Sequence, residues 1–360
     1  MPVLAALAAL ASCAGAPPPA PGGDVLAFRV FQFPADAIPR IDGDAGDWAM
    51  VGPGYAIGTD ALAADDGSGR RPDPKSLQVN IRVGWVKGLN RLYFLYEAQD
   101  DFWNFANPGL TNDIFELVVD GDRSGGPLIA RFHPELGKTL SARDAWFGFQ
   151  NIHAQNYHIF TPAGDKDWAM AWGPQAQWIK RLPWSNIAYR HSFKHGEGGK
   201  LVMEFWITPF DHADPDDPAK SVETELIEDR LIAMAWAVID DDGPGKRGFW
   251  NLSPHHTMYG KAAELCPFRL MPLDTAPFAA NWSFRILDRD RRTVAFRDES
   301  AGATGWKWDF GDGAGSTEQH PVHRYATPGK FVVTLEATGP KGKARLQKVW
   351  DVSFTGDPPK

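Results

Sequence analysis

The sequence predicts an all-β fold in which short strands pack as β-sandwiches. Residues 77–85, LQVNIRVGW, carry Leu, Val, Ile, Val and Trp at every second position, the alternation of a half-buried strand. Further short apolar segments are bounded by Gly, Pro, Asn or Asp, and no long stretch has the periodicity of an amphipathic helix. Many short strands joined by long loops favour a sandwich over an alternating βαβ fold.

The remaining predicted strands follow from the same patterns. They cover residues 91–98, 113–120, 200–208 and 231–240. In the last of these, LIAMAWAVID, bulky residues alternate with three alanines. A strand with one bulky face and one small face is expected between two packed layers.

Composition and charge limit the classes of function. A chain of 360 residues predicts about two domains. Its hydrophobic fraction of 43% can supply a sizeable core, and its charged fraction of 23% is that of an ordinary globular protein. The net charge is −8, and no basic stripe is interleaved with aromatic residues. Nucleic acid is therefore not an expected partner, because phosphate binding needs clustered Lys and Arg.

The N-terminal residues 1–13, MPVLAALAALASC, are too short to span a bilayer but fit a signal-peptide core. Leu10 to Cys13 resembles a bacterial lipobox, which implies that Cys13 is lipidated and that the exported protein is anchored in the cell envelope. With Ala14 next, the resemblance implies the outer membrane where the cell has one. No Lys or Arg precedes the apolar run, and a plain secretory signal is the alternative. Residues 14–24 are predicted to be an extended Pro/Gly tether, and Cys266 is expected to be a buried packing residue.

The C-terminal part carries a specific succession of motifs. These are WDFGDG at 308–313, Tyr325, Pro328-Gly329 and an apolar strand at 331–335. Asp312-Gly313 suits a tight turn, and Trp308 and Phe310 alternate toward one face. The segment from 294 to 352 resembles a PKD domain, an immunoglobulin-like sandwich. The resemblance implies a spacer or weak interaction module, predicted for residues 277–356.

The larger part of the chain carries a second succession. In order it contains Ile41-Asp42-Gly43, Asp47-Trp48, LYFLYEAQDDFWN at 92–104, NDIFELVVDGDRSGG at 112–126, LVMEFWITPFD at 201–211 and AWAVIDDDGPGKRGFW at 235–250. This order resembles family 9 carbohydrate-binding modules and their DOMON-like relatives. The resemblance spans residues 38–273 and implies a large β-sandwich domain at 25–276. It also implies that this domain binds an oligo- or polysaccharide without catalysis and can hold a structural calcium.

The stretch RIDGDAGDWAMVG, residues 40–52, opens this domain with carboxylates, glycines and a tryptophan. We predict an architectural corner in which Asp42-Gly43 turns the chain and Trp48 packs its indole against the sandwich. A metal loop is the alternative.

Sugar contacts are expected among the tryptophans, because a pyranose face can lie on an indole while carboxylates and amides meet its hydroxyls. The chain has 15 tryptophans, and five fall close together: Trp146, Trp168, Trp172, Trp178 and Trp184. At least half of these five are expected in the core. Trp103, with Asn104 beside it at a strand end, is the expected surface contact, together with Trp146 and Trp172.

Two groups of aspartates have the oxygen-rich composition that calcium accepts. They are Asp120 with Asp122, and Asp240 with Asp241 and Asp242. Turns are the alternative, because Asp beside Gly is typical of them. No His-x-x-x-His pattern accompanies His255 and His256, so zinc is not expected.

No enzymatic motif is present: the chain lacks G-x-S-x-G, a Walker loop and G-x-G-x-x-G. Glu97, Glu116 and Glu204 could supply a glycosidase pair, but each lies in a predicted strand, where a solvated outward position is expected. We therefore predict no catalytic residues.

Two further functions stay open. DOMON-like relatives include haem b electron carriers, and His255, His256 and Met258 in HHTMYGK are possible axial ligands, as are Met170, His153 and His158. The other alternative is a structural or adhesion protein in which both domains serve as spacers.

Overall fold

The computed structural model describes residues 27–106, 109–124, 134–139, 141, 150–164, 167–243, 245–253, 262–274 and 278–351. Helix in these ranges is limited to the six-residue α2 (Pro134–Thr139) and short 3₁₀ turns at Ala45–Trp48, Pro53–Tyr55, Thr59–Ala61, Gln177–Lys180, Pro218–Lys220 and Ala262–Glu264. The predicted all-β class is confirmed. Among the described helices, none has the length and apolar character required to cross a membrane.

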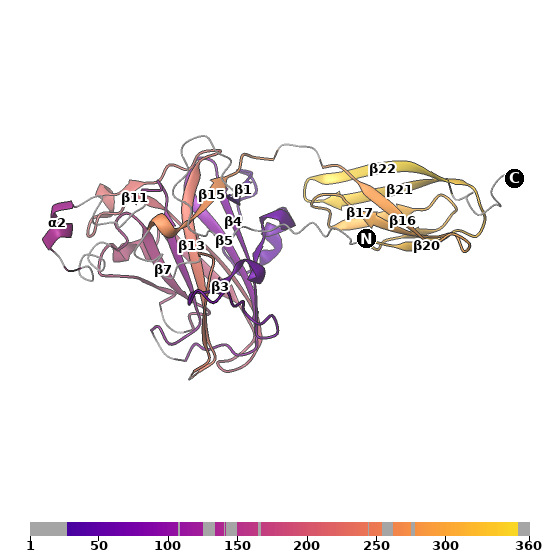
Figure 1. The fold of residues 1–360 in the computed structure, drawn as a ribbon. Helices are drawn as coiled ribbons and strands as arrows, with labels where there is room; N and C mark the ends of the chain where they lie inside the picture. The colour runs from indigo at the N-terminus through magenta and orange to yellow at the C-terminus, as the bar shows by residue number, and fades with distance from the viewer. Residues whose placement is uncertain are drawn as a thin grey trace. The chain divides into compact units, whose positions relative to one another are not determined.

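The chain separates into two compact units (Figure 1). Unit 1 comprises residues up to Asp47 and Tyr55–Leu273, and unit 2 comprises Trp48–Gly54 and the chain from Asp274 onward. The division after Leu273 lies close to the predicted domain boundary at 276.

Unit 1 contains two layers of strands that share β1. The first layer has the order β8 (Ala169–Ala171), β7 (Gln155–Phe160), β6 (Ile114–Asp120), β13 (Leu231–Asp241), β15 (Cys266–Leu270) and β1 (Phe28–Phe33). The second continues from β1 through β4 (Leu77–Val86), β5 (Leu89–Asp100), β10 (Gly199–Ile207) and β9 (Ser185–Arg190). Shorter strands are β2 (Ile57–Gly58), β3 (Ala63–Ala64), β11 (Phe210–His212), β12 (Val222–Glu223) and β14 (Arg247–Asn251).

Strand β1 joins the layers because its two halves pair with different neighbours. Its first residues run parallel to β15 and its last residues run parallel to β4. Indigo β4 and orange β15, far apart in sequence, therefore flank the same strand in Figure 1.

The core of unit 1 lies between the layers, where period-2 alternation points every second side chain inward. One cluster of buried residues contains Val79, Ile81, Val83 and Trp85 of β4 together with Phe115 and Leu117 of β6 and Trp236 of β13. The predicted half-buried strand at 77–85 is confirmed. Cys266 is fully buried in the same cluster, as expected.

Strand β13 divides its side chains as predicted. Ile232, Met234, Trp236 and Val238 belong to the main core, whereas Ala233, Ala235 and Ala237 belong to a second buried cluster on the opposite face of the sheet. That opposite face is therefore covered, and the polar side chains on it are buried as well.

Residues 42–44 form an architectural corner of unit 1. Gly43 has φ +77°, a conformation that favours glycine, and a Cβ there would lie 2.9 Å from the backbone of Tyr189. The backbone N–H groups of Asp42, Gly43 and Asp44 all donate to Oε2 of Glu204, at 3.3, 2.8 and 3.0 Å. Trp48 is fully buried.

Unit 2 is a smaller sandwich. Its sheets are β16 (Trp282–Asp288), β17 (Thr293–Asp298) and β20 (Val322–Arg324), and β19 (Gly315–Ser316), β18 (Gly305–Asp309), β21 (Lys330–Gly339) and β22 (Gly342–Asp351). Trp308 and Phe310 are buried in its core, as predicted, and Tyr325 donates from its hydroxyl to the carbonyl of Phe310 at 3.2 Å.

Candidate functional site

A row of polar side chains crosses the outer face of the first layer of unit 1. The strand registers place Glu116 of β6 opposite His158 of β7 on one side and opposite Ala237 of β13 on the other. Ala237 in turn lies opposite Asn251 of β14. Directly paired residues point to the same face of a sheet, so Glu116, His158 and Asn251 share this face, with the small side chain of Ala237 between them. We call Glu116, Asn156, His158 and Asn251 the polar row.

The carboxylate of Glu116 is held by its neighbours. Asn156 donates from Nδ2 to Oε1 of Glu116 at 3.1 Å. Nε2 of His158 lies 3.1 Å from the same oxygen, although the orientation is not that of a hydrogen bond. Glu116 is 4% exposed and His158 is 5% exposed. The expectation that Glu116 would be solvated is therefore wrong, because this face of the sheet is covered.

Trp172 lies beside the polar row. Its indole stacks on the imidazole of His158, with ring centroids 4.7 Å apart and an interplanar angle of 21°. Its backbone N–H donates to the carbonyl of Asn156 at 2.9 Å, and its carbonyl accepts from Nδ2 of Asn151 at 3.0 Å. Trp172 is half-buried, whereas the four residues of the polar row are buried.

Several buried atoms of the polar row have no hydrogen-bond partner. These are Oδ1 and Nδ2 of Asn251, Oδ1 of Asn156 and Nδ1 of His158. Asn251 is 1% exposed and Asn156 is completely buried. Because nearly all buried polar groups in native proteins have partners, these atoms represent unused capacity for donating and accepting hydrogen bonds.

Among the five tryptophans between residues 146 and 184, the other described ones have structural contacts. Trp168, Trp178 and Trp184 pack against the main core while remaining half-buried. The ring centroid of Trp178 lies 4.7 Å from that of Trp184 and 5.1 Å from that of Phe210. Trp172 therefore differs from these three in its position over polar side chains. Trp146, Cys13, His255, His256 and Met258 lie outside the described residues.

The prediction of Trp103 as an exposed sugar contact is wrong. Trp103 is 1% exposed and stacks on Phe193, with ring centroids 4.8 Å apart. Its Nε1 donates to the carbonyl of Gly199 at 2.8 Å. Asn104 is also structural, because its Nδ2 donates to the carbonyl of Asp241 at 2.8 Å. The loop that follows β5 folds back onto the end of the sandwich and buries the indole.

The three glutamates considered as a catalytic pair do not come together. Glu204 is completely buried and accepts the three corner N–H groups, whereas Glu97 forms ion pairs with Lys200 at 2.8 Å and Arg82 at 3.6 Å. Both lie on the outer face of the second layer. Glu116 is on the outer face of the first layer, on the far side of the core.

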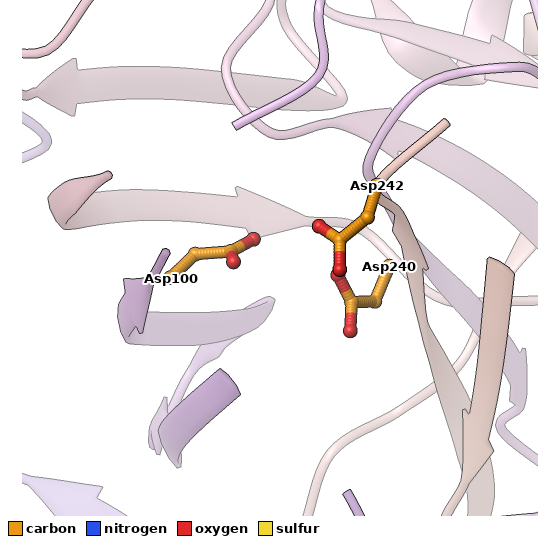
Figure 2. Close-up of side chains that lie close together, drawn as sticks. All are labelled: Asp100, Asp240 and Asp242. Atoms are coloured by element: carbon orange, nitrogen blue, oxygen red, sulfur yellow. The ribbon is translucent and has the colours of Figure 1, made fainter. Parts of the chain in front are cut away.

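A candidate metal centre lies at one end of the core of unit 1. Carboxylate oxygens of Asp100, Asp240 and Asp242 all lie within 4.8 Å of one another. Figure 2 shows the carboxylates of Asp240 and Asp242 side by side, with that of Asp100 pointing toward them. Asp100 is 1% exposed and Asp240 is 7% exposed. Oδ1 of Asp240 and Oδ1 of Asp242 are buried without a hydrogen-bond partner.

These carboxylates converge because the inward-facing positions of β5 and of β13 both end in an aspartate. The inward positions of β5 run from Phe94 through Tyr96 to Asp100, and those of β13 run from Trp236 through Val238 to Asp240. Continuing the alternation past the apolar residues could have identified Asp100 from the sequence.

Burial and mutual repulsion favour the protonated forms of this cluster. Burial, followed by the charge of Asp240, raises the pKa of Asp100 to about 8. Burial, followed by the charge of Asp242, raises the pKa of Asp240 to about 6. The neighbouring Asp113 has its pKa raised to about 9 by burial, although its carboxylate accepts backbone N–H groups of Asp241 and Asn104. The site is therefore electrostatically suited to a cation.

The remaining predicted metal ligands are elsewhere. Asp241 pairs with Arg247 at 3.4 Å and accepts the N–H of Gly243. Asp120 lies opposite Ala233 in the register of β6 and β13, about 23 Å along the strand from Asp240 at ~3.3 Å per residue. Asp120 and Asp122 both accept the N–H of Ser124, which is a turn arrangement. The two predicted aspartate groups therefore do not share an ion.

The donor set fits a hard divalent cation. Calcium takes six to eight oxygen ligands, including carboxylates and carbonyls. The cluster offers carboxylate oxygens and contains neither His nor Cys, which zinc prefers. The unpartnered Oδ1 atoms of Asp240 and Asp242 are available as ligands.

Comparison with known proteins gives similarities for both units. Residues 276–353 match the family model of the PKD domain. The PKD1 domain of the Vibrio cholerae metalloprotease PrtV is 26% identical, with a TM-score of 0.19, and the match covers 21% of this chain and 96% of that domain. No curated protein matches the chain.

Over a larger part of the chain, the structure is similar to a family 9 carbohydrate-binding module from Caldicellulosiruptor kristjanssonii. The form in complex with cellotriose is 12% identical with a TM-score of 0.43, and the match covers 69% of this chain and 96% of that module. The form in complex with glucose is 11% identical with a TM-score of 0.42, covering 69% and 97%. The PKD and family 9 resemblances inferred from the sequence recur among these similarities, and residues 276–353 are a PKD domain.

Proposed function

We propose that unit 1 is a non-catalytic module that binds carbohydrate over Trp172 and the polar row. The observation that carries this proposal is the set of buried, unpartnered donors and acceptors of Asn156, His158 and Asn251 beside a half-buried indole. Buried polar atoms without partners are costly, and a ligand that satisfies them recovers that cost.

A sugar ring has the chemistry that this arrangement requires. Each hydroxyl can donate and accept, so the hydroxyls of one sugar can meet both the amide of Asn251 and the carboxylate of Glu116. The apolar face of the ring can lie on the exposed part of Trp172. Since a single indole and a small polar row contact few sugar units, we expect a Kd between about 1 mM and 1 μM.

A glycan array followed by calorimetric titration tests the proposal, with cellotriose and glucose among the first probes. Trp172→Ala is expected to remove binding at this site, seen as a large loss of affinity for cellotriose and glucose, while leaving the unfolding midpoint nearly unchanged. The matched control is Trp184→Ala, which removes a half-buried indole that packs on the core. That control should lower stability but retain binding. Unchanged affinity of Trp172→Ala for cellotriose and glucose, or a wild type that retains no glycan, would contradict the proposal.

The non-catalytic assignment is supported by the separation of the glutamates. A glycosidase pair needs two carboxyl groups within about 10 Å on the same face, and Glu116 has the core between it and Glu97 or Glu204. Prolonged incubation of the protein with the bound glycan should release no reducing ends.

A haem role for the polar face is not favoured. His158 and Met170 are cross-strand neighbours on the same face, with Cβ atoms about 5 Å apart. Axial ligands must approach the iron from opposite sides, so these two cannot hold one haem together. A haem bound through His255, His256 or Met258 stays a prediction, and a Soret band from purified protein would support it.

We further propose that Asp100, Asp240 and Asp242 hold a calcium ion that stabilises unit 1. The proposal is supported by their convergence, their burial and the unpartnered Oδ1 of Asp240 and Asp242. A calcium ion would neutralise the mutual repulsion and fix the ends of β5 and β13. Isothermal titration of metal-free protein with calcium should show binding, which Asp240→Asn weakens and Asp122→Asn leaves unchanged.

We propose, from the sequence, that Cys13 is lipidated and anchors the protein in the cell envelope. Cells grown with labelled palmitate should yield labelled wild-type protein in the membrane fraction. The Cys13→Ser variant should be unlabelled and soluble, because one lost anchor removes membrane affinity. Unlabelled wild-type protein would overturn this assignment.

A further inference from the structure

A groove of about 990 Å³ lies on the outer face of the second layer of unit 1, on the opposite side of the core from Trp172. Its floor comprises side chains of β4, β5 and β10, and its walls are the segments around residues 56–60 and 71–74. This volume is at the upper end of that of small-ligand sites. Every lining residue belongs to unit 1.

The floor is a grid of hydrogen-bonding side chains. Gln78, Gln99 and Lys200 form one cross-strand row, and Asn80 lies opposite Glu97 in the next. Gln78 and Gln99 are exposed. Oδ1 of Asn80 is buried at the floor and has no hydrogen-bond partner. The groove therefore contains an acceptor that its own residues do not satisfy.

The cationic groups of the groove have hydrogen-bond or ion-pair partners within the protein. The carboxylate of Glu97 accepts from Nζ of Lys200 at 2.8 Å and lies 3.6 Å from Arg82. The guanidinium of Arg71 donates to the carbonyl oxygens of Asp60 and Leu62. No aromatic or large aliphatic side chain other than Val79 is among the lining residues. These features suit an uncharged, hydroxyl-rich ligand better than a phosphate or an apolar peptide side chain.

We propose that this groove is a second carbohydrate-binding site. The ligand class is the one in the proposed function, on which this inference rests, but the site uses different residues on a different sheet. Amides of Gln78, Asn80 and Gln99 can each donate to and accept from sugar hydroxyls. The open groove suits an internal stretch of a chain, because neither end of the chain needs to be enclosed.

Two sites on opposite faces of one sandwich would bind two segments of polysaccharide. A short oligosaccharide cannot reach both, but a polymer or a network of polymers can. Binding at one site raises the effective concentration at the other. We therefore expect an apparent affinity for soluble polysaccharide about 10- to 100-fold above that for an oligosaccharide hexamer.

The test uses the whole protein with cellohexaose, xylohexaose and the corresponding soluble polysaccharides as probes. The variants are Trp172→Ala, the double variant Gln78→Ala/Gln99→Ala, and both combined. Asn186→Ala is the matched control, because it removes an exposed amide from β9 outside the groove. Binding is followed by affinity electrophoresis and by the side-chain amide NMR signals of Asn80, Gln78 and Gln99.

We expect the amide signals of the groove to shift with hexamer in both the wild type and Trp172→Ala. The double variant should lose about 10-fold or more of polysaccharide affinity, and Asn186→Ala should lose none. If these signals stay unchanged while Trp172→Ala removes all binding, the groove proposal is overturned and the proposed function stands. If Trp172→Ala binds normally and the double variant does not, the groove stands and the site at Trp172 is overturned. A wild type that binds neither probe nor polysaccharide overturns both.

Discussion

Glu204 and Glu116 are buried strand glutamates on opposite outer faces of the same sandwich. Glu204 is completely buried and receives three backbone N–H groups from the corner at residues 42–44. Glu116 is almost as buried, but it lies in a row where Asn156, His158 and Asn251 retain unpartnered atoms. The two carboxylates differ in how completely their surroundings are satisfied, and burial alone does not distinguish them.

This difference distinguishes the structural role of Glu204 from the binding role proposed for the polar row. A carboxylate whose neighbours are fully paired stabilises the fold, because it provides the acceptor that a tight turn needs. Buried amides and imidazoles without partners do not stabilise the fold. Under the proposed function, a ligand that reaches this sheet face completes their hydrogen bonds.

The largest expected effect on stability comes from a comparison of two tryptophans, the buried Trp103 and the half-buried Trp172. Trp103→Ala should destabilise unit 1 by about 3–5 kcal/mol, because it removes a buried indole stacked on Phe193. Trp172→Ala should cost much less and should affect binding instead. Denaturant unfolding of both variants checks the difference. Equal losses of stability would mean that Trp172 is a core residue.

Removal of the Glu204 carboxylate should have the next largest effect on stability. Glu204→Ala leaves the N–H groups of Asp42, Gly43 and Asp44 without their acceptor, which should lower the free energy of unfolding by about 3 kcal/mol. Glu97→Ala, on the same face, should cost about 1 kcal/mol or less because its partners are long cationic side chains. A Glu204→Ala variant as stable as Glu97→Ala would refute the role of the corner.

Removal of calcium from the cluster of Asp100, Asp240 and Asp242 should lower the stability of unit 1 by a comparable amount. At 100 times its Kd, calcium should stabilise unit 1 by about 2.7 kcal/mol, which chelation would remove. Thermal melts with calcium and with chelator check this expectation. An unfolding midpoint that responds to neither would contradict the calcium site.

The pH dependence of the metal-free protein gives an independent test of the same cluster. The folded pKa values of Asp100 and Asp240, about 8 and about 6, lie above the ordinary value of 3.8. At these two groups the folded state therefore binds more protons than the unfolded state, so their contribution to stability is greatest below pH 4 and falls as the pH rises toward 8. Calcium should oppose this loss, and Asp100→Asn should reduce it.

The smallest effect on stability is expected at Glu116, the carboxylate of the polar row. Glu116→Gln keeps an oxygen that can accept from Asn156, so its effect on unfolding should be less than about 1 kcal/mol. Its loss of charge should weaken sugar binding by about 10- to 100-fold, since hydrogen bonds to charged groups are the stronger ones. Unchanged affinity in Glu116→Gln would remove Glu116 from the site.

Periodicity predicted the strands because alternation directly reports which side chains face the core. The strand at 77–85, the two-sided strand at 231–240 and the inward Trp308 and Phe310 all depend on neighbouring residues in one strand. The corner was predicted for a similar reason, since Gly43 supplies the left-handed turn locally. Its acceptor, Glu204, was not predicted, because it lies far away in sequence.

The errors arose where a residue's environment depends on distant segments. Trp103 sits beside Asp100, Asp101 and Asn104 in sequence, but Phe193 and Gly199 bury it. Asp241 was grouped with its neighbours, but alternation and Arg247 turn it away from Asp240 and Asp242. Charge and polarity along the chain could not reveal these contacts.

By itself the sequence determined that this protein is all-β, that its C-terminal part has the PKD motif, and which faces of its strands are apolar. These properties follow from local alternation and from turn residues. Tertiary structure alone decided which polar groups meet: Asp100 with Asp240 and Asp242, Glu116 with Asn156 and His158, and Asn80 with the amides of the groove. The physical reason is that strand order and register, rather than sequence spacing, set the distances between side chains across a sheet.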